Sequence, residues 1–302
     1  MIIYTLIGIT LLLAGFSLHL VWKAGNRPLK YTYPYLFLGL TLCVFLYLFG
    51  VWVYISIYTK YLFGALILIF CISYLARKHD HSARPLSRWK KVTNLLISGV
   101  LLVLIVLYFT GTTGKPKTVE LAFPFKPGRY FVLQGGKGLP TNLFHFSLRG
   151  AVYAMDIVKL NKFGGRADKI FSKNLADYEI YNDTIYAPCD GLVARAVSSN
   201  PDNIPPNMNR GPKNTNQIVL ETPTFNVFMA HLKMNSIVVR EGDYVTKGQP
   251  LGCVGNSGFS TEPHLHIQVH EKTPGVAWYF GKPLYIHFNG RGYLLNEVIT
   301  IK

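Results

Sequence analysis

The sequence predicts an N-terminal region of four transmembrane helices followed by a mainly antiparallel β domain. Two observations predict this division. Residues 1–113 contain four long apolar runs with few charges, whereas from Gly114 onward short apolar runs of period two are broken by Gly, Pro, Asn and Asp. We therefore expect two domains, a membrane anchor at 1–113 and an extracytoplasmic domain at 114–302.

The four apolar runs lie at residues 2–22, about 34–56, 61–76 and 92–110. Their lengths suit a bilayer, whose crossing takes about 20 residues. Only Tyr58, Thr59 and Lys60 separate the second run from the third, which predicts a tight helical hairpin. A cleaved signal peptide is the alternative for the first run, although no basic segment precedes it and no small-residue cleavage site follows.

The basic residues predict the orientation of the helices. Basic loops stay in the cytoplasm, so the first and third loops are expected there. The protein is then a multi-pass protein of the cell (inner or plasma) membrane, with both termini and the second domain outside the cytoplasm. The three loops contain, in order, Lys23, Arg27 and Lys30; Lys60; and Arg77, Lys78, Arg84, Arg88, Lys90 and Lys91.

The net charge of +16 is mostly explained by these loops. Residues 1–91 hold 10 basic residues and one acid, and the 21 basic and 14 acidic residues that follow leave about +7. That excess suits an anionic surface such as a cell wall or lipid headgroups. No nucleic-acid-binding motif accompanies it, so we expect no nucleic-acid partner.

Cysteine usage gives no metal motif. Cys43 and Cys71 lie in apolar runs, and Cys189 and Cys253 lie in the second domain, without metal-binding spacing. Four free thiols are expected; a disulfide between Cys189 and Cys253 remains open outside the cytoplasm.

The sequence pattern of the second domain predicts short strands joined by turns. The Asn- and Pro-rich residues 198–216 predict a long loop. The expected strands are 130–133, 152–158, 184–186, 191–197, 217–221, 226–232, 236–239, 251–254 and 264–270.

The clearest chemical signal is the segment PHLHIQVH at 263–270. Alternate residues of a strand share a face, so His264 and His266 point together while the apolar residues between them pack behind. Such a pair is a candidate for metal binding or acid–base catalysis. We expect His270, further along at the strand end, to be solvated.

Zinc catalysis needs three protein ligands and an open position for water. Further donors must come from elsewhere in the domain, and the candidates are His145, Asp156 and His231. Asp156 has apolar neighbours on an expected strand. Because a buried, unpaired carboxylate is costly, we expect a metal or another cation beside it.

These residues together resemble the lysostaphin-type (LytM-domain) zinc metallopeptidases. The resemblance is carried by YAPCDGLV at 186–193, by VVREGDYVTKGQPLGCVGNSGFSTEPHLHI at 238–267, and by the upstream His145 and Asp156. It covers roughly residues 140–270, and a Gly-Asn-Ser-Gly turn before His-x-His is highly specific. It implies a compact antiparallel β domain of the LytM/lysostaphin-like, duplicated-hybrid-motif type.

The resemblance also implies the site. His145, Asp156 and His266 would bind one Zn²⁺ per chain, while His231 and His264 would flank the metal-bound water. The implied activity is endopeptidase cleavage of peptidoglycan stems or cross-links. One departure is the ten-residue gap between His145 and Asp156, where many members have His-x3-Asp. This ligand set would also accept other divalent metals.

Two other functions remain open. A catalytically inactive LytM-like domain would bind cell-envelope components or partner proteins, and a signalling protein would use the zinc domain as its output. The expected partners are a peptidoglycan or envelope peptide and the lipid bilayer, with membrane partner proteins left open.

Overall fold

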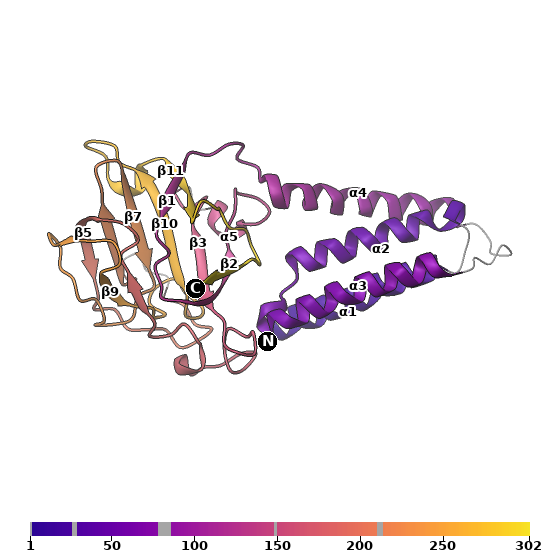
Figure 1. Cartoon of the computed structure of the whole chain (residues 1–302), viewed down its shortest axis with the longest axis horizontal. Coiled ribbons are helices and arrows are strands. Elements are labelled where there is room, and N and C mark those ends of the chain that lie inside the picture. Colours follow the sequence, from indigo (N-terminus) through magenta and orange to yellow (C-terminus); the bar gives the residue numbers. More distant parts are fainter. Residues whose placement is uncertain (1, 26–28, 78–85, 148–149, 210–213) are drawn as a thin grey trace. The chain divides into compact units, whose positions relative to one another are not determined.

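The computed structural model describes residues 2–25, 29–77, 86–147, 150–209 and 214–302 (Figure 1). The chain divides into two compact units, Met1–Phe109 and Thr110–Lys302. The first contains four long helices and the second a mainly antiparallel sheet, which confirms the predicted fold class. Arg27, Lys78 and Arg84, which contribute to the predicted orientation, lie outside the described residues.

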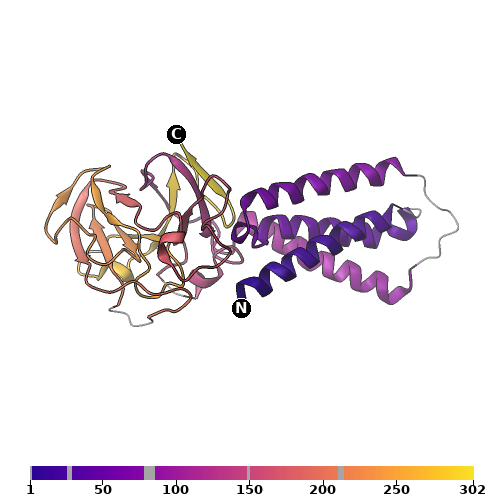
Figure 2. The same ribbon diagram turned by 90° about the horizontal axis from the view of Figure 1, so that it is seen from below.

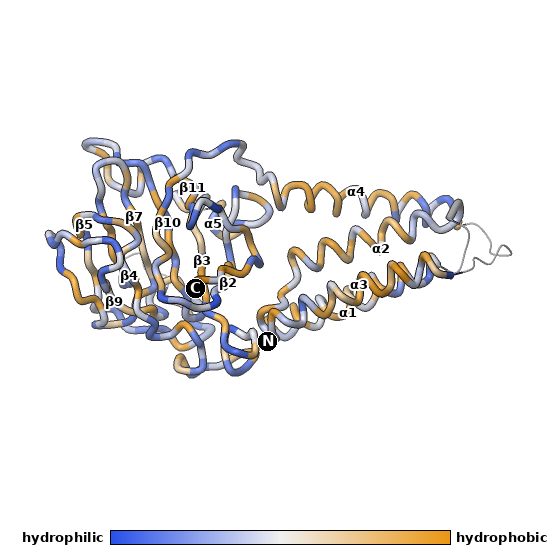
Figure 3. The backbone as a smooth tube through the Cα atoms, viewed as in Figure 1, coloured by the Kyte–Doolittle hydropathy of each residue, from blue (hydrophilic) through white to orange (hydrophobic). Residues whose placement is uncertain are grey.

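The helices are α1 (Ile2–Ala24), α2 (Leu29–Phe49), α3 (Ile57–Ala76) and α4 (Arg88–Thr110). All four are long and apolar enough to cross a membrane, and hydrophobic residues run along each of them (Figure 3). The helices run side by side (Figure 2). Leu18 and Val21 of α1 pack against Leu42 of α2 and Phe63 of α3, while many other apolar side chains stay exposed, as a lipid-facing helix requires.

The turn between α2 and α3 does not lie where the sequence predicts it. Residues Tyr58–Lys60 belong to α3, and the chain turns earlier, through the short 3₁₀ helix η1 (Trp52–Tyr54). The Trp52 indole donates to the Leu46 carbonyl (2.8 Å), and the Ser56 side chain caps the first turn of α3. Residues 51–55 are apolar, so hydropathy alone did not reveal this break.

The second unit is built on a ten-stranded sheet with strand order β12-β2-β3-β10-β7-β6-β5-β8; β11 pairs with β10, and β1 with β11. Among the strand pairs that the structure describes, only that of β1 with β11 is parallel. A separate two-stranded sheet joins β4 and β9. The strands are β1 (Thr118–Leu121), β2 (Gly128–Gln134), β3 (Met155–Lys159), β4 (Thr184–Tyr186), β5 (Gly191–Val197), β6 (Gln217–Glu221), β7 (Phe225–Ala230), β8 (Tyr244–Val245), β9 (Pro250–Cys253), β10 (Leu265–Glu271), β11 (Pro283–Phe288) and β12 (Val298–Ile301).

Most expected strands are present, with two corrections. The strand expected at 152–158 begins only at Met155, because Ala154 N–H closes a turn onto the Ala151 carbonyl (2.8 Å). The strand expected at 236–239 is absent from the described residues. There Val238 donates a single hydrogen bond to Leu251, and Asn235 just before it has a φ of 57°, which ends the extended path.

One apolar core joins the strands of the sheet. Met155, Ile157, Leu220, Met229 and Ile267 are among its fully buried members. The described part of 198–216 is irregular, as expected, and touches the sheet region through an isolated bridge between Asp202 and Ser257. All four cysteines lie within the described residues and are free thiols.

Candidate metal centre

Strand β10 presents the His-x-His pair to one face of the sheet. Leu265, Ile267 and Val269 point into the apolar core and are fully buried. His264, immediately before the strand, and His266 within it therefore face the opposite side. The strand therefore alternates between apolar residues in the core and histidines on the other face, as the sequence predicts.

Asp156 reaches the same place from the neighbouring strand β3. It stands directly opposite His266 in the antiparallel register of β3 and β10, and side chains of directly opposed residues meet on one face of a sheet. The distance from Asp156 Oδ1 to His266 Nδ1 is 3.0 Å. Two residues 110 positions apart in sequence thus become neighbours through strand pairing alone.

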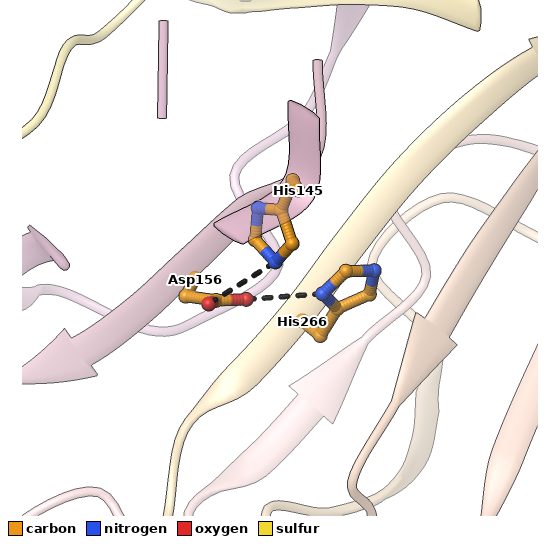
Figure 4. A group of neighbouring side chains, drawn as sticks. All are labelled: His145, Asp156 and His266. Carbon is orange, nitrogen blue, oxygen red and sulfur yellow. Dashed lines mark hydrogen bonds and ion pairs between the residues drawn. The ribbon is translucent and has the colours of Figure 1, made fainter. Parts of the chain in front are cut away.

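His145 comes from a short helix, α5 (Leu143–Phe146), which precedes β3. Its Nε2 lies 3.3 Å from Asp156 Oδ2, and its ring centroid lies 4.9 Å from that of His266. Figure 4 shows the three side chains pointing toward one another from α5, β3 and β10.

The donor atoms of these three side chains fit a metal ion. One ligand atom from each of His145, Asp156 and His266 can be chosen so that all lie within 4.8 Å of one another. Donor atoms in a tetrahedral zinc site lie about 3.3 Å apart; here the two different oxygens of Asp156 lie 3.3 Å from His145 Nε2 and 3.0 Å from His266 Nδ1. The set can therefore hold a divalent cation.

The charge of Asp156 supports the same conclusion. Its side chain is 13% exposed, and within the described part of the chain its ion-pair partners are all histidines: His145, His264 and His266. Burial raises the pKa of Asp156, but the opposing effect of His145 and His264 is larger. The pKa is therefore held well below its usual range. A largely buried carboxylate that stays ionised needs a positive charge beside it, which a protonated histidine or a bound cation can supply.

His231 and His264 lie beside this group, with ring centroids 4.7 Å apart. His231 follows the end of β7 in a left-handed conformation (φ 66°), which is uncommon for a residue other than glycine. Its Nδ1 lies 2.8 Å from the Ser257 carbonyl, and Nδ1 of His264 lies 2.8 Å from the Glu262 carbonyl. Since a carbonyl only accepts, both Nδ1 atoms carry the proton, and each neutral ring keeps Nε2 as its lone pair.

The two rings differ in how readily they take a proton. Burial, together with the nearby His264 and His266, holds the pKa of His231 well below its usual range. Burial also lowers the pKa of His264, but Asp156 outweighs burial and raises it. The structure thus brings all five sequence-predicted residues together and gives His231 and His264 unlike protonation behaviour.

Strand β10 also corrects one expectation. His270 is fully buried rather than solvated. Its ring meets Trp278 edge-on at 5.6 Å, and its Nδ1 lies 3.0 Å from the Gly281 carbonyl. Solvation was expected because His270 lies near a strand end. In the structure, however, β11 pairs with β10 at His270.

A buried ion pair next to the site was not predicted from the sequence. Arg166 donates to both carboxylate oxygens of Glu262, at 2.8 and 2.6 Å. Glu262 lies two residues before His264 and also supplies the carbonyl that accepts from that ring. The pair therefore links the segment that contains Arg166 to the His-x-His segment, 96 residues further along the chain.

Residues 174–277 match the model of Peptidase family M23. The β unit therefore contains a domain of Peptidase family M23, which confirms the resemblance seen in the sequence. The matched residues include His231, His264 and His266 but begin after His145 and Asp156. This match supports a peptidase-like function.

Several solved structures are similar to the chain. A zinc-containing peptidase from Vibrio cholerae shares 18% identity over 56% of this chain and 39% of its own, with a TM-score of 0.33. Lysostaphin, an antimicrobial peptidase from Staphylococcus simulans, shares 21% over 52% and 47%, with a TM-score of 0.31. The catalytic domain of a prophage-encoded M23 protein, EnpA, from Enterococcus faecalis shares 18% over 58% and 93%, with a TM-score of 0.30.

The chain thus spans less than half of the length of the first two structures. A search of curated proteins gave no match.

Proposed function

We propose that the protein is a membrane-anchored zinc metalloendopeptidase that hydrolyses peptide bonds of peptidoglycan stems or cross-links. His145, Asp156 and His266 hold one Zn²⁺ per chain. The observation that carries this proposal is the convergence of one partly buried carboxylate and two buried imidazoles on a single point, with two further buried histidines beside it. Three protein ligands are the usual number in a catalytic zinc site.

Zinc bound at this point supplies a Lewis acid that polarises a carbonyl and lowers the pKa of water. The protein's own residues move the proton. His231, whose pKa is held down, stays neutral and accepts a proton at Nε2 from the attacking water. His264, whose pKa is raised beside Asp156, donates a hydrogen bond from Nε2 to the developing oxyanion once protonated.

The alternative function is a catalytically inactive domain that binds envelope components or partner proteins. Binding alone requires neither the metal-ligand set nor the two flanking histidines. All five side chains are kept and all five converge, which favours hydrolysis. The excess positive charge of the second domain suits an anionic cell wall.

We place the four helices in the cell membrane as a multi-pass anchor, with the bilayer as its partner. The distribution of Lys and Arg among the loops supports a position of both termini and the peptidase domain outside the cytoplasm. Peptidoglycan lies on that side of the membrane, so orientation and substrate agree.

The experiment that tests the function compares His231→Ala and His264→Ala with the unchanged chain, purified in detergent. Both variants should keep one zinc per chain, because neither histidine belongs to the ligand set. Both should lose about 10²- to 10⁴-fold in the rate of peptide release from peptidoglycan, the usual contribution of a general acid or base. His287→Ala, on β11, is the matched control and should hydrolyse normally.

Three outcomes decide between the functions. Zinc binding with hydrolysis that both variants lack supports the peptidase. Zinc binding without cleavage of any peptidoglycan peptide supports the binding domain. If the chain binds no zinc when zinc is supplied in excess, both the metal centre and the mechanism are contradicted.

The proposed orientation is tested by labelling introduced cysteines with a membrane-impermeant maleimide, after replacement of the four native ones. Ser87→Cys lies before α4 and Lys272→Cys follows β10, and both positions are exposed. Cysteine at 272 should react in intact cells or spheroplasts, and cysteine at 87 only after permeabilisation. The reverse pattern would place the β unit in the cytoplasm and exclude peptidoglycan as its substrate.

A further inference from the structure

The segment that follows α4 is hydrogen-bonded to the loop that leads to α5. The Thr112 N–H and the Thr113 hydroxyl both donate to the Lys137 carbonyl, each at 3.0 Å. In the opposite direction, the Leu139 N–H donates to Thr112 Oγ1 at 3.1 Å. All of these residues lie within the second unit. We call this contact, between residues 111–113 and 137–139, the clasp.

Two glycines with a left-handed backbone allow the two segments of the clasp to approach each other. Gly111 has a φ of 67°, and a Cβ at this position would clash with the Lys137 carbonyl oxygen. Gly138 has a φ of 86°, and a Cβ there would lie 2.9 Å from both Thr112 Oγ1 and Thr113 Cγ2. Since residues with a Cβ rarely adopt this conformation, the clasp requires glycine on both sides.

Main-chain hydrogen bonds continue from the clasp to the helix that carries His145. The Gly138 carbonyl accepts from the Asn142 N–H, and the Asn142 carbonyl accepts from the Phe146 N–H, both at 2.9 Å. The second of these bonds closes the single turn of α5, in which His145 is 6% exposed. A helix this short is not stable by itself. Its position is therefore set by the contacts that hold its ends.

A second support holds the same end of α5. The side chain of Asn142 is fully buried and donates to the Val152 and Ala154 carbonyls at 3.1 and 2.9 Å. This anchor fixes one residue but not the direction from which the chain enters it. The clasp fixes residues 137–139, from which the chain comes. The two supports together determine where α5 places the imidazole of His145.

We propose that Gly111, Thr112 and Thr113 form a positioning element for His145, in which the segment after the last apolar helix holds the loop that leads to α5. The role of His145 as a metal ligand rests on the proposed function, whereas the effect of the clasp on α5 does not. Gly111 directly follows α4. The chain that leaves the apolar helices thus supports the candidate centre and does more than tether it.

The test compares Gly111→Ala with Gly114→Ala in the full chain, purified in detergent. The two glycines have similar φ values, 67° and 72°, so both variants carry a similar backbone strain. A Cβ at Gly114 meets no atom of the described residues within 4 Å apart from its chain neighbours, whereas one at Gly111 displaces the Lys137 carbonyl. Zinc affinity, measured by competition with a chelator, should fall about 3- to 10-fold in Gly111→Ala, the effect of losing one or two hydrogen bonds. Gly114→Ala should bind zinc normally.

Thr112→Val is a milder variant that keeps the backbone and the shape of the side chain. It removes only the acceptor of the Leu139 N–H and should weaken zinc binding by about 2- to 5-fold. Thr118→Val, at an exposed threonine of β1, is its control and should bind zinc normally. This pair keeps the test decisive if Gly111→Ala does not fold.

A double variant shows whether the clasp acts through His145. If it does, Gly111→Ala should cause no further loss of zinc affinity in a chain that already carries His145→Ala. A general loosening of the β unit would instead add its full effect to that of His145→Ala, because independent changes are additive.

Amide hydrogen exchange in the metal-free chain tests the clasp without reference to zinc. The amides of Asn142 and Phe146 should exchange about 3- to 10-fold faster in Gly111→Ala than in Gly114→Ala, because local opening of α5 becomes easier. The amides of β10 should exchange at the same rate in both variants.

The inference is overturned if the amides of Asn142 and Phe146 exchange alike in the two variants, because the Asn142 side chain then suffices to hold α5. It is also overturned if Gly111→Ala weakens zinc binding equally with and without His145. If the unchanged chain binds no zinc and exchange at α5 rises only in Gly111→Ala, the proposed function fails and the positioning role of the clasp stands.

Discussion

The Asp156→Asn variant of the full chain is expected to lose both bound zinc and peptide hydrolysis. Asp156 is the acidic member of the candidate centre, and its two oxygens lie 3.3 and 3.0 Å from nitrogens of His145 and His266. An amide preserves the shape but removes the charge and one acceptor. Structural zinc sites bind with about 10–16 kcal/mol over roughly four ligands, so losing one ligand should weaken binding on the order of 100-fold or more.

His266→Ala should give the same double loss, because it removes a proposed ligand from the other strand. Zinc content after dialysis and the rate of muropeptide release are the two measurements, and circular dichroism reports whether the sheet remains folded. Asp168→Asn, at an exposed aspartate of the same unit, is the control and should keep zinc and activity. Zinc retained by folded Asp156→Asn at full affinity would contradict the assignment of this ligand.

The Glu262→Gln variant should lower the thermal stability of the β unit strongly. Arg166 and Glu262 form a bidentate ion pair whose side chains are 1% and 8% exposed. The amide keeps the size of Glu262 but leaves the guanidinium buried without its counter-charge. Removing one partner of a buried pair costs about 3–5 kcal/mol, and for a domain of this size each kcal/mol lowers Tm by about 2–4 °C.

A double variant separates charge from packing. Arg166→Met with Glu262→Leu removes both charges, and its Tm should lie well above that of Glu262→Gln, since an apolar pair can replace a buried ion pair at little cost. Glu221→Gln tests a surface pair, Lys272 with Glu221, whose side chains are each 35% exposed. That change should cost no more than about 1 kcal/mol. Equal losses in the buried and surface variants would refute a special role for the Arg166 pair.

The parts of the centre that were predictable from sequence lie on regular strands. Alternation along β10 placed His264 and His266 on one face, and the apolar neighbours of Asp156 marked it as a buried carboxylate that needs a cation. His145 was one of the candidate donors, but only the family resemblance selected it as a ligand, because α5 is four residues long and shows no helical periodicity.

The sequence analysis did not predict β1, β8, β11 or β12, and for β1 and β12 the physical cause is the same. β12 pairs with β2, and β1 pairs with β11, so each finds its partner far away in sequence. Short strands of this kind are stabilised by the partner's edge rather than by their own pattern. The region 236–239 shows the converse: Ile237, Val238 and Val239 have strand propensity, yet no ladder forms there.

The order of the elements along the chain has a consequence for biosynthesis. The four helices are translated before any strand, whereas Asp156 and His266 are 110 residues apart and meet only when β10 pairs with β3. A ribosome that has finished the four helices has therefore not yet produced the candidate metal centre. The proposed hydrolysis would begin only in chains that already carry these helices.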